Sequence, residues 1–320
     1  MWASTRTCER APGCAWELFR RSLILQPMTT DLNTPIPGNT QDKLEPAPYT
    51  QRYFDAAGVK LHYLDYGTEG LPPMLCVHGG GAHAHWYDYI APGFTSDYHV
   101  RAIDLQGHGD SDWVDPPAYT YVDFAANIDA LVRHLDLRDF VLVGHSMGGA
   151  VSLVYAANHP GRVKTLIIVD TTVNLSPERI AAMRDVGTRT GRKYDTQEEM
   201  MAKFRLRPGS SNAAPDVLRH IASHSGREQP DGSWSHKFDR NVYGTREVND
   251  LRPNWNRIKT PLLLVKGGHS ERISPAVFED VKSRCPQAEL VEVSASDHHV
   301  TLDNPREFIA KVKPFLARMR

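Results

Sequence analysis

A serine with a glycine two residues away on either side stands at positions 144–148, where the sequence reads GHSMG. The apolar run FVLV precedes it and the small-residue run AVSLVYAA follows it, so we expect the chain to pass here from a strand into a helix. A serine on so sharp a turn takes a strained backbone conformation, and the glycines remove side chains that would collide there. The pattern predicts that Ser146 is a nucleophile on a strand-to-helix elbow.

A nucleophilic serine that attacks a carbonyl group needs donors for the oxygen that becomes negative. The sequence HGGG at positions 78–81 directly follows the apolar run PMLCV, and glycines allow a backbone N–H to come close to a substrate. The residue after the nucleophile offers a second donor at the start of its helix. We therefore predict an oxyanion hole made by the N–H groups of Gly80 and Met147.

The serine also needs a general base, which is close in the fold although distant in the sequence. The segment SASDHHVTLDNP follows the last apolar run, and it offers His298 as the base and His299 as a neighbour. His83 and His85 form a His-x-His pair, but the pair alone lacks the carboxylate or further imidazole that completes a metal site. We therefore expect neither a metal nor an organic cofactor.

Short apolar runs that alternate with helical patterns must position these residues. RYFDAAGVKLHYLDYG predicts a hairpin that turns at Ala57-Gly58, and six further runs follow: PMLCV, HVRAID, FVLVGH, VKTLIIVD, PLLLVKG and AELVEV. Continuous rather than alternating apolar strands indicate an α/β fold, with a mostly parallel central sheet and helices on both faces. Residues 171–258 show helical patterns without a convincing strand, so we expect a helical cap insertion between two core segments, 51–170 and 259–320.

The whole-chain composition limits the partners and the compartment. Lys plus Arg total 37 and Asp plus Glu total 38, so a formal net charge of -1 gives no electrostatic reason to expect nucleic acid or an anionic membrane. Small neutral molecules fit better. The sequence contains no CxxC pair, which argues against a disulfide framework and favours a reducing, cytoplasmic location. The cysteines are Cys8, Cys14, Cys76 and Cys285.

The first 50 residues are expected to form a flexible leader, because they are polar and rich in proline and glycine. Their longest apolar run within residues 1–27 is LIL, which is far too short for a signal peptide or a membrane span. Our hypothesis is that Met28 is the natural start and that residues 1–27 are upstream readthrough.

From Tyr53 to the C-terminus, this architecture and the order serine, acid, histidine resemble the α/β-hydrolase fold. DHHVTLDNP is similar to the family's GHxV-x-L-E-N-P signature, with His298 in the catalytic position, and DLQGHGDSD is similar to its D-x-x-G-x-G-x-S loop, which is expected to be structural. The resemblance implies an acid after the run PLLLVKG, where GGHSERISP offers Glu271 in place of an aspartate. Asp170, at the end of LIIVD, holds the alternative acid position. We predict Glu271 as the acid.

These residues together predict a serine hydrolase of small to medium carboxylic esters or lactones that works through an acyl-enzyme. Haloalkane dehalogenases and epoxide hydrolases resemble the chain but need a carboxylate where Ser146 stands. Carbon-carbon bond hydrolases and cofactor-free haloperoxidases use a similar triad and remain alternatives, as does a receptor that binds a ligand without turnover. Trp86, Tyr87 and Trp234 either line the substrate pocket or belong to the core. The oligomeric state is not indicated.

Overall fold

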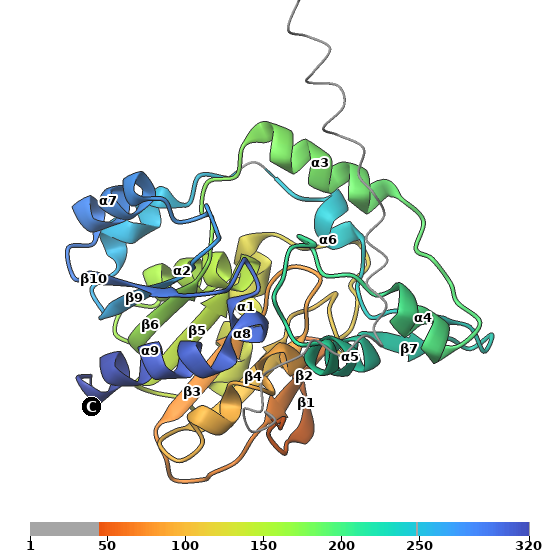
Figure 1. Ribbon diagram of the computed structural model, residues 1–320, viewed down its shortest axis with the longest axis horizontal. Coiled ribbons are helices and arrows are strands. Elements are labelled where there is room, and N and C mark those ends of the chain that lie inside the picture. The colour runs from red at the N-terminus through yellow and green to blue at the C-terminus, as the bar shows by residue number, and fades with distance from the viewer. Residues whose placement is uncertain (1–44, 248, 320) are drawn as a thin grey trace, which may run out of the picture. The chain divides into compact units, whose positions relative to one another are not determined.

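The computed structural model describes residues 45–247 and 249–319, most of them built around one sheet with helices on both faces (Figure 1). The sheet has eight strands in the order β1-β2-β4-β3-β5-β6-β9-β10. The pairs β1·β2 and β2·β4 are antiparallel, and all pairs from β4 to β10 are parallel, which confirms the predicted mostly parallel sheet. The strands are β1 (Thr50–Ala56), β2 (Val59–Asp65), β3 (Pro73–Val77), β4 (His99–Asp104), β5 (Phe140–His145), β6 (Val163–Val169), β9 (Leu262–Gly267) and β10 (Ala288–Val293).

The first two strands form the predicted hairpin. Ala56 pairs with Val59, so the turn consists of two residues, Ala57 and Gly58. Both have a positive φ, 56° and 91°, as a turn that matches the twist of the flanking strands requires.

The inner strands are buried on both faces, which explains their continuous apolar sequences. In β3, Leu75 and Val77 belong to the core cluster that also holds α1 and α2, while Met74 and Cys76 belong to the cluster on the opposite face, which holds α9. Successive side chains of a strand point to opposite faces of its sheet. A strand between two helical layers must therefore be apolar at every position.

Two helical layers cover the sheet. Thr120 starts α1 with a capping box, in which its hydroxyl accepts from the Asp123 N–H and the Asp123 carboxylate accepts from the Thr120 N–H. Asn304 caps α9. The helices of the two layers are α1 (Tyr121–His134), α2 (Met147–Asn158), α7 (Pro275–Arg284), α8 (Val300–Asp303) and α9 (Pro305–Ala317), with the 3-10 turns η1 (Ala84–Tyr87) and η2 (Ala91–Gly93).

The segment between β6 and β9, residues 171–258, is called the cap segment below. Most of its regular elements are helices, but it also holds a two-stranded sheet in which Glu228 pairs with Trp234. The expectation that this segment contains no strand is therefore wrong. Its elements are α3 (Pro177–Thr188), α4 (Gln197–Lys203), α5 (Pro215–His224), β7 (Gly226–Glu228), β8 (Trp234–His236), α6 (Asn241–Gly244) and η3 (Arg252–Arg257).

Several expectations concern residues outside the described ranges. They are the Met28 start, the first two cysteines and the predicted leader apart from residues 45–50. The other two cysteines, Cys76 and Cys285, are free and buried. Among the described residues, no helix has the length and apolar character needed to cross a membrane.

Candidate active site

Ser146 stands on the turn between β5 and α2, where the sequence pattern places it. Its backbone angles are φ 54° and ψ -118°, a conformation that non-glycine residues rarely adopt. The Ser146 N–H donates to the carbonyl of Val169 at the end of the neighbouring strand β6 (2.9 Å). The turn therefore holds the side chain at the carboxyl edge of the parallel strands.

The two flanking glycines are required by the close approach of other backbone atoms. A Cβ on Gly144 would lie 2.4 Å from the carbonyl oxygen of Gly148, and a Cβ on Gly148 would lie 2.2 Å from the carbonyl oxygen of Val77 in β3. Neither distance is possible for a real side chain. This geometry confirms the physical reason for which the sequence pattern needs a glycine at each position.

Ser146 is connected by hydrogen bonds to a histidine and a buried aspartate. His298, in the loop after β10, lies with Nε2 2.9 Å from Ser146 Oγ and with Nδ1 2.7 Å from Asp170 Oδ2. Because an ionised carboxylate only accepts hydrogen bonds, Nδ1–H donates to Asp170, and Nε2 is left to accept the serine hydroxyl proton. In this tautomer His298 can remove the proton from Ser146.

The structure corrects the predicted acid. Glu271 lies exposed in the loop after β9, whereas Asp170 is fully buried at the end of β6 and contacts His298 directly. Asp170 also accepts hydrogen bonds from the Ser270 hydroxyl (2.8 Å) and the Gly267 N–H (3.3 Å). The residue just before Glu271 thus holds the aspartate in place, while Glu271 itself faces solvent.

The buried position shifts the pKa values of both partners. Burial lowers the pKa of His298 well below its ordinary value, and the nearby Arg272 lowers it further. Burial raises the pKa of Asp170, although the hydrogen bonds from Ser270 and Gly267 act in the opposite direction and lower it. At neutral pH the imidazole is therefore unprotonated, which is the form that a general base needs.

The predicted oxyanion residues, Gly80 and Met147, lie in the pocket of the nucleophile, and a Cβ on Gly80 would lie 3.5 Å from Met147 Sδ. They line one pocket together with Ser146 and His298. A Cβ added to Gly80 would meet the Tyr243 ring at 3.1 Å, and the Tyr243 hydroxyl donates to the Gly80 carbonyl (3.0 Å). Tyr243, from the cap segment, therefore fixes the glycine loop beside Ser146. Sequence reasoning did not single out this residue.

The pocket has a volume of about 330 Å³ and lies between core and cap segment. Its apolar walls include Leu175, Met183 and Val186 from the cap segment and Tyr121 from the core. Trp86 and Tyr87 are buried in core clusters instead, and the lining does not include Trp234. The lining also includes the arginines Arg179, Arg207, Arg246 and Arg272.

Arg246 is the most buried of these arginines, with 3% exposure. Its Nη2 contacts Met147 Sδ at 2.9 Å, and its guanidinium lies 4.8 Å from the centre of the Tyr121 ring. Nε and Nη1 are buried, and they have no hydrogen-bond partner among the described residues. A buried cation with unpaired donors is costly for a protein, so these donors suit an anionic ligand. No motif marks this arginine in the sequence.

The other two histidines beside the site have structural contacts. His145 Nε2–H donates to the carbonyl of His298 (2.8 Å) and so fixes the loop that carries the base. His299 Nε2–H donates to the carbonyl of Pro208 in the cap segment (2.8 Å). The contact of His299 agrees with its expected place as a neighbour of the base.

Residues 72–305 match the alpha/beta hydrolase fold family. The chain belongs to this family. It is 26% identical to the 2-(acetamidomethylene)succinate hydrolase of Mesorhizobium japonicum, over 84% of this chain and 95% of the relative. It is 28% identical to the pimeloyl-[acyl-carrier protein] methyl ester esterase of Neisseria meningitidis, over 78% of this chain and 94% of the relative. The crystal structure of E-2-(acetamidomethylene)succinate hydrolase has the same fold, with a TM-score of 0.74 and 24% identity, and the match covers 84% of this chain and all of that one.

Proposed function

We propose that this family member is a serine hydrolase that cleaves small to medium carboxylic esters through an acyl-enzyme. The observation that carries the proposal is the hydrogen-bonded series from Ser146 through His298 to the buried Asp170, which opens into a closely lined pocket. Among curated relatives, the pimeloyl-[acyl-carrier protein] methyl ester esterase has a name that fits this chemistry.

Each residue has one role in the proposed reaction. Ser146 Oγ attacks the ester carbonyl while His298 Nε2 takes its proton, and Asp170 stabilises the imidazolium that forms. The Gly80 and Met147 N–H groups hold the oxyanion. The carbonyl then re-forms, the alcohol leaves with the proton from His298, and a water molecule activated by the same nitrogen hydrolyses the acyl-enzyme.

The direct test is covalent labelling of the nucleophile. A phosphonate ester should label Ser146 and abolish activity against p-nitrophenyl esters, and Ser146→Ala should lower kcat by at least about 10⁴-fold with little change in Tm. Ser283→Ala, an exposed serine on α7, is the matched control and should keep full activity. Labelling at another serine, or a near wild-type rate in Ser146→Ala, would refute the proposal. Ligand binding without an acylation burst would indicate a receptor instead.

We further propose that the preferred substrate carries a carboxylate near the scissile bond. The unpaired donors of Arg246 support this, together with Arg179 and Arg207 in the same pocket, because guanidinium groups bind carboxylates in a bidentate way. Arg272 is already paired with Asp170, whose Oδ2 lies 3.5 Å from its Nε. The net charge of -1 led to the expectation of small neutral substrates, but a whole-chain sum does not describe a local pocket. The relative named 2-(acetamidomethylene)succinate hydrolase acts, by its name, on a dicarboxylate. Hydrolysis of such an acylamino dicarboxylate is therefore the second candidate function.

A pair of substrates that differ in charge tests this preference. A half-ester such as monomethyl succinate should have a higher kcat/KM than dimethyl succinate. Arg246→Gln should raise KM for the half-ester by about 10-fold or more and leave the diester nearly unchanged, while Arg246→Lys should retain part of the preference. Equal losses for both substrates in Arg246→Gln would mean that the arginine only supports the fold.

A further inference from the structure

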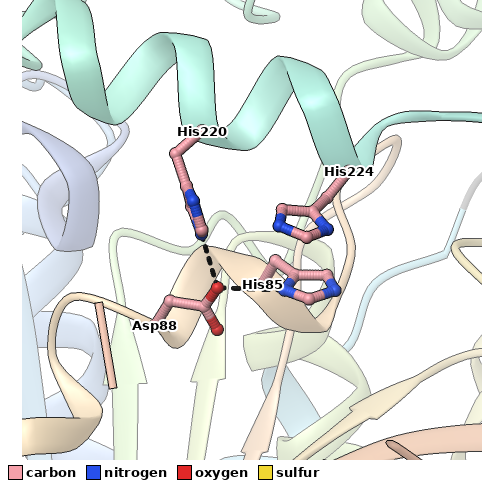
Figure 2. A group of neighbouring side chains, drawn as sticks. All are labelled: His85, Asp88, His220 and His224. Carbon is pink, nitrogen blue, oxygen red and sulfur yellow. Dashed lines mark hydrogen bonds and ion pairs between the residues drawn. The ribbon is translucent and has the colours of Figure 1, made fainter. Parts of the chain in front are cut away.

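Four side chains with metal-binding atoms converge at a place that the proposed reaction does not use. They are His85, Asp88, His220 and His224, called the histidine cluster below (Figure 2). His85 lies in η1 and Asp88 follows η1 directly, while His220 and His224 are four residues apart and so lie on one face of α5. The cluster therefore joins the core to the cap segment.

The ligand atoms already lie close to the spacing that a metal ion needs. Asp88 Oδ2 is 2.9 Å from His85 Nδ1 and 2.6 Å from His220 Nε2, and all four ligand atoms lie within 4.8 Å of one another. Tetrahedral zinc with bonds of about 2.0–2.1 Å places its ligand atoms roughly 3.3 Å apart. The observed separations lie on both sides of this value, so shifts of about 1 Å would complete the coordination.

The groups around the cluster orient its carboxylate. The Tyr66 hydroxyl donates to Asp88 Oδ1 (2.7 Å), which leaves Oδ2 directed toward the imidazoles. Partners of this kind fix the ligands in protein metal sites. Asp88 and His85 are buried, whereas His220 exposes 19% of its side chain and offers an ion a route from solvent.

A hydrogen-bond network explains only part of the arrangement. His85 and His220 can each donate to Asp88, and those two contacts alone would link η1 to α5. His224 instead stacks on the His85 ring, with 3.6 Å between ring centres, and one of its ring nitrogens lies within 4.8 Å of the other three ligand atoms. Three imidazoles and one carboxylate form a complete ligand set for zinc.

We propose that the histidine cluster binds one divalent transition-metal ion, with Zn²⁺ preferred, and that this ion fastens α5 of the cap segment to η1. The sequence predicts no metal site because the His-x-His pair alone lacks the carboxylate or further imidazole that completes one. The fold supplies two further imidazoles, His220 and His224, from more than a hundred positions away, while the carboxylate of Asp88 stands three positions after His85. Only one member of the His-x-His pair takes part. His83 is directed elsewhere, with Nε2 2.9 Å from Ser225 Oγ.

The test measures metal content on the untagged full chain. After treatment with a chelator and equilibrium dialysis against Zn²⁺, elemental analysis should find about one zinc per chain, and Tm should rise by about 5 °C at saturating zinc. Co²⁺ should give the visible absorption bands of a tetrahedral site. These measurements use the wild-type chain, so they remain valid even if a substitution impairs folding.

His224→Gln should remove most of the bound zinc and the Tm increase, because glutamine is a poor zinc ligand of similar size. His134→Gln, an exposed histidine at the end of α1, is the matched control and should bind zinc as the wild type does. A wild-type chain that stays free of zinc and gives no tetrahedral Co²⁺ spectrum would overturn the proposal, and so would full zinc binding by His224→Gln. Neither result bears on the ester hydrolysis proposed for Ser146.

Discussion

At the scale of single residues, the identity of the acid is the sharpest question. Asp170→Asn would keep the shape of the side chain but remove the charge that selects the His298 tautomer and stabilises the imidazolium. We expect kcat to fall by about 10³ to 10⁴-fold. Glu271→Gln is the matched control and should stay within about 2-fold of wild type, because Glu271 is exposed. Steady-state kinetics of both variants decide the matter, and the reverse pattern would return the acid role to Glu271.

The pH dependence follows from the shifted pKa of the base. His298 must be neutral to accept the Ser146 proton, and burial lowers its pKa below the ordinary value of about 6.5. The fraction of enzyme in which His298 is neutral therefore stays high as pH falls from 8 to about 6.5, and it falls only at lower pH. A profile of log kcat/KM against pH should bend below about 6.5. A bend at or above pH 7 would contradict this environment for His298.

The local sequence was sufficient to predict that Ser146 and His298 come together, but it was not sufficient to predict which carboxylate contacts His298. The glycines on either side mark the elbow serine in the sequence, and the histidine follows the last strand of the sheet. Asp170 and Glu271 both follow strands that end at the same edge, and β6 and β9 are neighbours in the sheet. Which carboxylate reaches His298 depends on how each loop folds over that edge, and sequence spacing does not contain this information.

At the scale of elements, the packing of α2 against β3 should be sensitive to a single methyl group. A Cβ on Gly148 would lie 2.2 Å from the Val77 carbonyl oxygen, so Gly148→Ala must displace the helix or the strand. We expect a loss of about 2–4 kcal/mol in the free energy of unfolding, together with a large loss of activity. Thermal or urea unfolding measures the loss of stability.

The matched control for this prediction is Gly191→Ala in the cap segment. A Cβ there would lie 3.8 Å from the nearest neighbouring atom, Arg240 Nε, and should be tolerated. If Gly148→Ala were as stable as Gly191→Ala, the elbow would have room that the structure does not give it.

Elements whose buried apolar residues recur in a regular pattern could be predicted from the sequence. Elements without such a pattern were missed. All eight strands of the main sheet coincide with the predicted apolar runs or with the predicted hairpin. The inner strands show continuous apolar runs because each is buried on both faces. The strands β7 and β8 have only three residues each and are mostly not buried, so no periodic pattern marks them. Their pairing depends on the cap segment around them.

At the scale of the whole molecule, features made by distant residues could not be predicted from the sequence. The histidine cluster joins two segments whose nearest members, Asp88 and His220, are separated by 132 positions. The pocket arginines come from α3, from loops of the cap segment and from the loop after β9. Neither group forms a motif in the sequence, because only the folded chain brings its members together.

The distribution of charge over the molecule gives a last prediction. The chain is almost neutral, with a formal net charge of -1, while four arginines line the pocket that holds the nucleophile. An anionic ester should therefore be attracted mainly by the pocket, and salt should screen that attraction over a Debye length of about 10 Å at 0.1 M. We expect kcat/KM for monomethyl succinate to fall severalfold between about 0.02 and 0.5 M NaCl, while the value for dimethyl succinate stays nearly constant. Arg179→Gln, which removes an exposed arginine of the pocket on α3, should weaken the salt dependence without abolishing activity. The same salt dependence for the charged and the neutral ester would show that the pocket arginines do not attract the substrate.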